Sequence, residues 1–268
     1  MNKWRRYNGA LIPVAPPHIK VDCSNIEVKV KETNSYFARW TSDFDCDLET
    51  EFWHVICDQA IAINSLSRNT RSKIRRGTKY CVVKLINKDS LIENGYDCYF
   101  SAFSKYNTYL QPKTKIQFQK EIESLDENWD FWGVFHDNKM IGYSQNRVID
   151  DSCDYSTIKF HPDSLKFYSS YTLFYTMNQY YLNEKSFRYV NDGARSISHK
   201  TNIQSFLIDK FKFRKAYCKL NIIYSPKVKL ILSIIYPIRW FLSFLDFGPF
   251  VKLNVLMFQE KIRRSYER

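Results

Sequence analysis

Two side chains that can move a proton lie seven residues apart, on either side of a turn-like segment. Asp192 follows the strand-like run 187–190, and His199 precedes a helical pattern that begins near Asn202. Histidine ionises near neutral pH, so His199 is our first choice for a general base, with Asp192 to orient or replace it. Two plainer interpretations stay open: Asp192 and Gly193 form only a turn, and His199 only caps a helix.

A second group of chemically useful side chains is a run of cations, LSRNTRSKIRRG, at 66–77. Ser67 is suited to cap a helix and Gly77 to end it, so the spacing predicts a basic helix over 67–77. On that helix Arg71 and Arg75 share a face with Arg68, where they could bind phosphate oxygens. The alternative is a basic face that contacts only solvent.

The composition restricts the kinds of partner that these residues can bind. The chain has 268 residues, of which 44% are hydrophobic and 17% aromatic, enough for one large domain or two small ones. The net charge of +12 favours an anionic partner, which could be a phosphate-bearing cofactor, a nucleic acid or an acidic membrane surface. Only seven glycines occur, all isolated, which disfavours a glycine-rich phosphate loop.

The cysteines and histidines give no ligand cluster. The seven cysteines are scattered without a CxxC pair, and the five histidines are dispersed. This pattern is typical of reduced thiols in a cytoplasmic compartment, and we expect no metal site. The N-terminal segment, whose short apolar run is broken by prolines, is a poor match to a signal peptide.

Hydrophobic periodicity predicts an alternation of strands and helices. A three-stranded meander is expected at 131–136, 139–149 and 153–160, followed by a helix from about Ser164 to Asn183. A strand at 187–190, a helix after Asn202 and strands within 216–224 complete this part. Further elements are expected upstream: strands at 26–30, 35–40 and 51–57, and helices at 89–106 and 113–125.

This order resembles the GNAT acyltransferase fold, and the cationic run resembles a basic helix of Fem-like acyl and peptidyl transferases. The resemblance covers roughly residues 50–224. It implies an α+β fold with a mixed, mostly antiparallel GNAT-like central sheet flanked by helices. The implied organisation is a partial N-terminal GNAT-like unit at 1–110, an acyltransferase core at 111–224 and a hydrophobic helical tail at 225–268.

The resemblance also assigns roles. In the family the third core strand splays from the fourth, which places acyl-carbonyl binding at Ile158, Lys159 and Phe160 and makes Asp192 and His199 face the same cleft. The remaining expected donor ligands are Lys166, Ser169, Ser170 and Asn202. Tyr217 is a further catalytic candidate, and Arg195 joins Arg71 and Arg75 as a substrate or phosphate ligand.

Three positions depart from the family pattern. Where acetyl-CoA-binding members have a glycine-rich turn, this chain has LKFYSSY at 165–171, in which Phe167 and Tyr168 would crowd a pyrophosphate. Lys212 stands where the family usually has glycine, and Ile208 where many members have tyrosine. The donor is therefore expected to be an acyl-CoA held differently, or an aminoacyl-tRNA.

The tail is apolar but interrupted by prolines and cations, so it predicts two short amphipathic segments at a membrane interface. The alternatives are packing on the core or a dimer contact. The predicted function is acyl or aminoacyl transfer to an amino sugar or peptide of a surface-glycan or cell-wall precursor. The acceptor could be lipid-linked, at the inner face of the cytoplasmic membrane, and nucleic acid enters only as aminoacyl-tRNA. The alternative is an inactive GNAT scaffold that binds RNA or tethers a glycan-assembly complex.

Overall fold

The computed structural model describes residues 4–106, 110–197, 202–242 and 249–266. The chain forms two compact units, each built from separate stretches of sequence. The first unit comprises Met1–His54, Ala194–Thr201 and Lys215–Arg268, and the second comprises Val55–Gly193 and Asn202–Arg214. Three of the four boundaries between the units fall within strands, namely β4 (Trp53–Cys57), β9 (Tyr189–Ala194) and β10 (Arg214–Tyr217). The sequence-based division at 110 and 224 stays a prediction.

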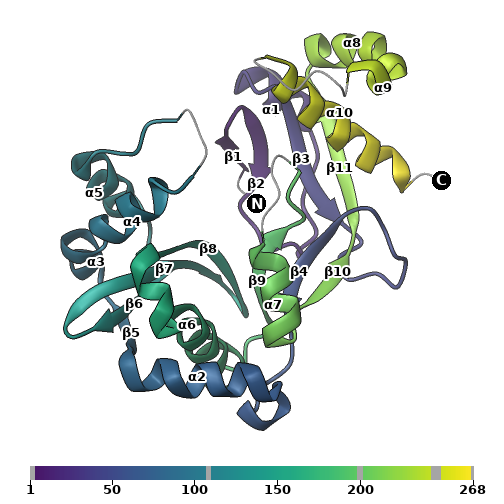
Figure 1. Cartoon of the computed structure of the whole chain (residues 1–268). Helices are drawn as coiled ribbons and strands as arrows, with labels where there is room; N and C mark the ends of the chain where they lie inside the picture. Colours follow the sequence, from purple (N-terminus) through teal and green to yellow (C-terminus); the bar gives the residue numbers. More distant parts are fainter. Residues whose placement is uncertain (1–3, 107–109, 198–201, 243–248, 267–268) are drawn as a thin grey trace. The chain divides into compact units, whose positions relative to one another are not determined.

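The second unit is organised around the predicted meander. Strands β5 (Val82–Ile86), β6 (Trp129–His136), β7 (Lys139–Ile149) and β8 (Ser152–Phe160) are antiparallel neighbours. They belong to a seven-stranded sheet of order β10-β4-β9-β8-β7-β6-β5 (Figure 1). Asp137 and Asn138 both have positive φ, as a tight hairpin between β6 and β7 requires. The α+β class with a mostly antiparallel sheet is therefore confirmed.

Three short helices cover one face of this sheet. They are α3 (Lys88–Asn94), α4 (Tyr96–Phe103) and α5 (Lys115–Glu123). Their buried side chains, among them Leu91 and Phe118, pack against Phe131 of β6 and Tyr143 of β7. The single helix expected at 89–106 is divided at Gly95, which caps α3 and precedes α4.

The opposite face is covered by one helical segment, and the helix that carries the basic segment packs on that segment. These are α6 (Ser169–Asn178) and α2 (Arg68–Tyr80), with η2 (Pro162–Phe167) and η1 (Ile63–Ser65) before them and a π-helical continuation, η3 (Gln179–Glu184), after α6. The segment predicted as one helix at 164–183 therefore consists of a 3-10 helix, an α-helix and a π-helix in succession. Helix α7 (Ile203–Phe211) ends at Lys212, which has φ of 57° at the position where the family usually has glycine.

The predicted end of the basic helix is wrong. Ser67 caps α2 by accepting from the backbone N–H of Thr70, as expected, but the helix continues to Tyr80. Gly77 is buried inside it, where a Cβ would lie 2.0 Å from Thr172 Oγ1 and 2.9 Å from the carbonyl of Tyr168. This glycine therefore lets α2 pack closely on the first turn of α6 rather than ending the helix.

The first unit contains a smaller sheet of order β1-β2-β3-β11. Its strands are β1 (Trp4–Tyr7), β2 (Ala10–Pro13), β3 (Phe37–Ser42) and β11 (Lys219–Tyr224). The strand expected at 26–30 is instead part of helix α1 (Ile26–Glu32). Ile26 and Val30 are buried against Leu11 and Ala38, while Val28 is 51% exposed. Apolar residues at i, i+2 and i+4 have the period of a strand, but the i and i+4 pair taken alone also fits a helix, and only that pair is buried.

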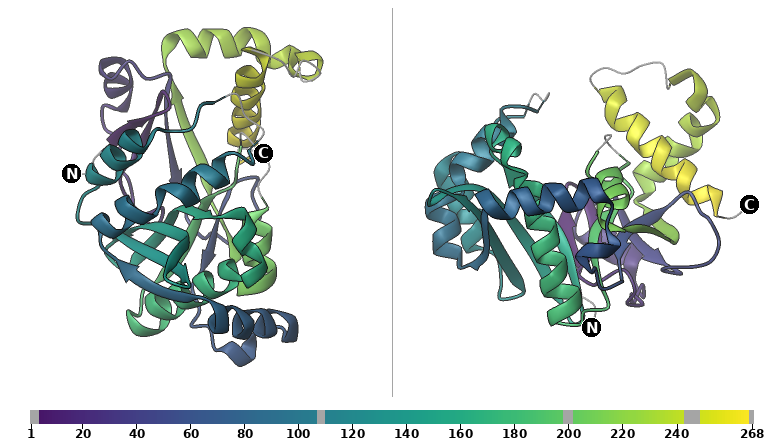
Figure 2. Two further views of the ribbon diagram at one scale, coloured as in Figure 1. Left: turned by 60° about the vertical axis from the view of Figure 1, so that its left-hand side comes forward. Right: turned by 60° about the horizontal axis from the view of Figure 1, so that its bottom comes forward.

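The helical tail is confirmed, and it divides into two parts within the first unit. Helix α10 (Pro249–Ser265) packs Phe258 and Ile262 against Leu220 and Ile222 of β11. Helix α8 (Pro226–Ile235) is followed by η4 (Tyr236–Ile238) and α9 (Arg239–Leu242) (Figure 2). No helix in the described part of the chain is both long and apolar enough to span a membrane.

Candidate functional site

The strands β8 and β9 pair over only three residues. They are parallel, and the pairing joins Ser152 to Tyr189, Cys153 to Val190 and Asp154 to Asn191. From Tyr155 to Phe160, β8 keeps its pairing with β7 but has none with β9. The splayed pair implied by the resemblance is therefore present, and the edge of β8 that would pair with β9 is left open beyond Asp154.

A β-bulge marks the point where the two strands separate. Gln145 of β7 pairs with Thr157 and Asn146 pairs with Tyr155, so Ser156 of β8 has no partner on β7. An extra residue bends its strand and increases its twist. The bulge therefore gives a local cause for the departure of β8 from β9 immediately after Asp154.

Asp192 lies one residue beyond the last paired position of β9. Burial raises the pKa of its carboxyl to about 7. Among the described residues, its carboxylate forms no hydrogen bond or ion pair. A carboxyl that titrates near neutral pH and is not engaged elsewhere is suited to accept a proton.

Two neighbouring side chains shape the strand around Asp192. The side chain of Asn191 donates to Asp154 Oδ1 at 2.8 Å and accepts from the N–H of Gly193 at 2.9 Å. Gly193 has φ of 92°. The predicted break at 192–193 is therefore a local kink, because β9 continues to Ala194. Tyr155, whose pKa is raised by burial and also by Asp192, donates to Asn178 Oδ1 at 2.7 Å.

The three residues expected to bind the acyl group lie together. Ile158, Lys159 and Phe160 line a hollow of about 300 Å³ beside the open length of β8. Its remaining walls come from α4, the residues after it and η2: Ala102, Lys105, Tyr106, Pro162 and Leu165. Lys159 donates to the hydroxyl of Tyr106 at 2.7 Å. Sequence reasoning missed Tyr106, because its position after α4 gives no periodic signal.

The first turn of α6, the expected phosphate position, is in contact with the basic helix. Lys73 donates to the hydroxyl of Tyr171 at 3.2 Å, and Arg76 donates to that of Tyr168 at 3.4 Å. Ser169 is fully buried, and its hydroxyl donates to the carbonyl of Ser164. Its hydroxyl is thus not available as a phosphate ligand.

The other expected donor ligands have different surroundings. Ser170 is half-buried in the first turn of α6, and Lys166 is exposed in η2 with its ammonium 5.2 Å from the Phe167 ring. Asn202 is the exposed N-cap residue of α7, but its side chain makes no capping hydrogen bond. These three positions therefore stay predictions.

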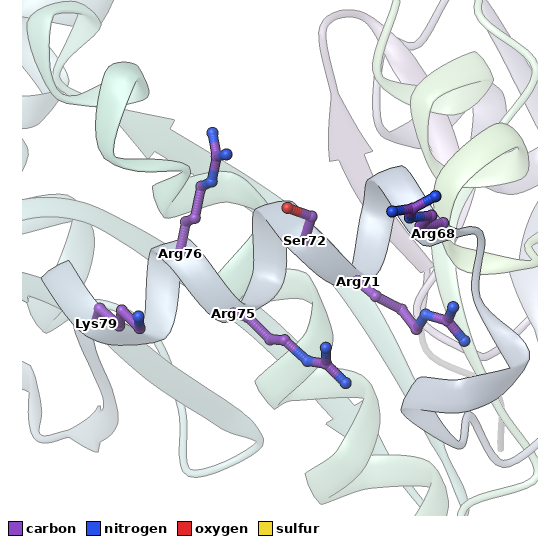
Figure 3. Close-up of a pocket in the computed structure, with 6 residues that line it drawn as sticks. All are labelled: Arg68, Arg71, Ser72, Arg75, Arg76 and Lys79. Atoms are coloured by element: carbon purple, nitrogen blue, oxygen red, sulfur yellow. The ribbon is translucent and has the colours of Figure 1, made fainter.

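Helix α2 carries a basic hollow of about 400 Å³, lined by Arg68, Arg71, Ser72, Arg75, Arg76 and Lys79. Figure 3 shows Arg71 and Arg75 extending to the same side of the helix, with Arg76 on the opposite side. Arg71 donates to the carbonyl of Asn64 at 3.2 Å. Arg75 forms no ion pair within the described part of the chain. Both side chains therefore line this hollow, and their binding of an anion stays a prediction.

Two predicted site residues belong to the first unit and are engaged there. Arg195 forms an ion pair with Glu51 at 2.8 Å and stacks on Trp53 at 4.5 Å. Tyr217 donates to Glu49 Oε1 at 2.6 Å, which raises the pKa of its hydroxyl. His199 lies outside the described residues, so its role stays a prediction. The described residues include no group of three potential metal ligands.

Comparison with solved structures shows the fold. FemX superposes with a TM-score of 0.60 at 9% identity, over 87% of this chain and 86% of FemX. The C-terminal domain assigned to a lysylphosphatidylglycerol synthetase from Agrobacterium fabrum gives 0.53 at 12% identity, over 87% and 84%. L-PGS from Bacillus licheniformis gives 0.51 at 8% identity, over 89% and 85%. No protein-family model and no curated protein matches the sequence. The GNAT-type, Fem-like fold expected from the sequence is thereby confirmed.

Proposed function

We propose that this protein transfers an acyl or aminoacyl group to an amine, using the gap between β8 and β9. The observation that carries the proposal is the end of the β8–β9 pairing at Asp154, two residues before the bulged Ser156 and beside the half-buried Asp192. A parallel pair that stops after three residues leaves backbone N–H groups of β8 without strand partners. Those groups are the donors that an acyl oxygen needs.

The chemistry follows from these positions. The acceptor ammonium first gives a proton to the carboxylate of Asp192, which generates a free amine. The amine nitrogen attacks the acyl carbonyl, and the open edge of β8 at 158–160 stabilises the resulting oxyanion. The tetrahedral intermediate then breaks its bond to the leaving group. The attacking nitrogen gives up its second proton to the leaving group, which departs as the thiol of CoA or the ribose hydroxyl of tRNA, and the new C–N bond remains.

Charge and fold support the proposed donor, and the proposed acceptor follows from the family resemblance. The donor is an acyl-CoA or an aminoacyl-tRNA, both of which carry phosphates suited to Arg71 and Arg75 on α2. The acceptor is an amino sugar or peptide of a surface-glycan or cell-wall precursor. The proposed location is the inner face of the cytoplasmic membrane. The neighbours FemX and a lysylphosphatidylglycerol synthetase domain support an aminoacyl or acyl donor in general terms.

The test is transfer by the purified protein. It is incubated with radiolabelled acyl-CoA or aminoacyl-tRNA and an amine acceptor, in lipid-linked and in water-soluble form. We expect label in the acceptor, and we expect Asp192→Asn to lower the rate while Asp137→Asn, at the exposed β6–β7 turn, leaves it unchanged. Full activity in an Asp192→Ala, His199→Ala double variant would remove both residues from the mechanism.

A second function, an inactive scaffold that binds RNA or tethers a glycan-assembly complex, is favoured by one observation. Tyr168 and Tyr171 occupy the start of α6, where acetyl-CoA-binding members of the family have a glycine-rich turn. Both tyrosines are hydrogen-bonded to α2, so they fill the place in which those members bind the pyrophosphate. A salt-titrated RNA gel shift separates the two functions. Binding that survives moderate salt without any transfer supports the RNA scaffold, whereas weak binding lost at moderate salt, together with transfer, supports the enzyme.

A further inference from the structure

The segment from Pro226 to Trp240 has an apolar side that the first unit leaves uncovered. Its exposed large side chains are Leu230, Ile231, Ile234, Ile238 and Trp240, with exposed fractions between 47% and 69%. On α8 the first three lie at i, i+1 and i+4, so they form one stripe. The stripe continues through Ile238 to Trp240 at the end of the segment.

The orientation of this stripe is fixed by the opposite side of the same segment. Leu232 and Tyr236 are buried. The ring of Tyr236 lies 4.1 Å from the guanidinium of Arg264 on α10, and Arg264 is ion-paired with Glu260. Glu260 in turn accepts from the hydroxyl of Tyr224 on β11 at 3.0 Å. Turning α8 to bury its outer side chains would break this connected set of contacts.

The charges beside the stripe indicate what covers it. Lys227 lies at its N-terminal end and Arg239 beside Trp240, and both are exposed, whereas Lys229 lines a hollow that Glu27 and Glu260 also line. The sequence from 225 to 245 contains no aspartate or glutamate. An apolar stripe edged by cations, with a tryptophan at its end, matches the boundary between anionic lipid headgroups and acyl chains.

A second copy of the chain fits this surface poorly. A two-fold dimer through the stripe would bring Lys227 and Arg239 of each copy together, with no aspartate or glutamate on the segment 225–245 to pair with them. The overall charge of +12 adds to that repulsion.

We propose that α8, η4 and α9 bind an anionic lipid surface, with Leu230, Ile231, Ile234 and Ile238 inserted and Lys227 and Arg239 at the headgroups. The inference rests on the proposed function in one respect: the membrane surface would bring the transferase to a lipid-linked acceptor. Binding itself requires no substrate and no transfer.

The experiment is flotation of the whole protein with vesicles of phosphatidylcholine alone and of equal parts phosphatidylcholine and phosphatidylglycerol. We expect strong flotation only with the anionic vesicles, decreasing with salt. Leu230→Gln combined with Ile234→Gln should lower the partition coefficient by at least about tenfold, since two large apolar side chains no longer insert. The matched control is Leu48→Gln with Ile116→Gln, which are 60% and 65% exposed elsewhere and should float like the original protein.

Light scattering and transfer assays complete the test. Equal flotation of the α8 variant and the original protein would overturn the proposal. So would a dimer that the α8 substitutions dissociate, in a protein that does not float. The α8 variant should still transfer to a water-soluble acceptor while losing transfer to a vesicle-bound one. Loss of all transfer in a protein that floats normally would count against the proposed transferase activity and not against the proposed lipid-binding surface.

Discussion

Replacing Asp192 by asparagine should make the protein more stable and less active at the same time. The carboxyl is held by its surroundings with a pKa of about 7, compared with an ordinary value of 3.8. The cause is burial, which disfavours the charged form. Asparagine has nearly the same shape and no charge, so the substitution removes this electrostatic cost together with the proposed proton acceptor.

The magnitude follows from the difference between the two pKa values. As pH rises above 3.8 the unfolded chain releases this proton, but the folded chain keeps it until about pH 7. The original protein therefore loses stability across that window, by at most about 4 kcal/mol at 1.36 kcal/mol per unit, and less in so far as water reaches the gap. Above the window the loss is constant. The asparagine variant has no such loss.

Urea unfolding at pH 5 and at pH 8 measures the stability difference. We expect the advantage of Asp192→Asn over the original protein to grow between the two pH values, while Asp137→Asn, 90% exposed at a hairpin turn, shows no such growth. The kcat/KM of the original protein should rise with pH and level off above about 7. That of the variant should be lower by about 100-fold or more. A stability advantage that does not change with pH would refute the raised pKa of Asp192. Unchanged activity in the variant would refute the catalytic role of this carboxyl.

Three further predictions concern the elements around the site. Gly77→Ala should destabilise the protein to urea by about 1–3 kcal/mol, because the new Cβ meets Thr172, and adding Thr172→Ala should recover part of the loss. Lys212→Gly should stabilise it by about 1 kcal/mol in the same assay, since a φ of 57° is costly for a side chain with a Cβ, whereas Lys210→Gly inside α7 should destabilise it. Arg71→Gln with Arg75→Gln should raise the KM for a phosphate-bearing donor about tenfold or more with little change in kcat, an effect that shrinks with salt. Arg5→Gln with Arg6→Gln on β1 is the control for that pair, and an equal rise in KM there would show that only overall charge matters.

The order of elements in the second unit could be predicted from the sequence because its signals are local. The turns Asp137-Asn138 and Asp150-Asp151 delimit β6, β7 and β8, whose alternating side chains meet helices on both faces. Likewise Ser67 supplied a cap for α2 that the structure confirms. The grouping of Ile158, Lys159 and Phe160 at one hollow followed from the family resemblance and not from periodicity.

Other features depend on contacts between distant residues, which no local pattern encodes. Gly77 carries an ordinary helix-ending signal, but the neighbouring α6 helix gives it a packing role. Asp192 carries a turn signal, but its chemistry comes from burial beside the end of the β8–β9 pairing. Arg195 is a plausible anion ligand by type, but Glu51 and Trp53 already engage it.

The pairing of β3 with β11 has a consequence for how the chain matures in the cell. Trp40 pairs with Asn221, so β3 emerges from the ribosome well before its partner, by about 180 residues or some ten to forty seconds of synthesis. In that interval Phe37 lacks the β11 side chains against which it packs in the folded protein. The second unit, whose stretch from Val55 to Gly193 is made in between, can mature first. Nascent chains stalled before residue 219 should thus engage holdase chaperones through their earliest strands.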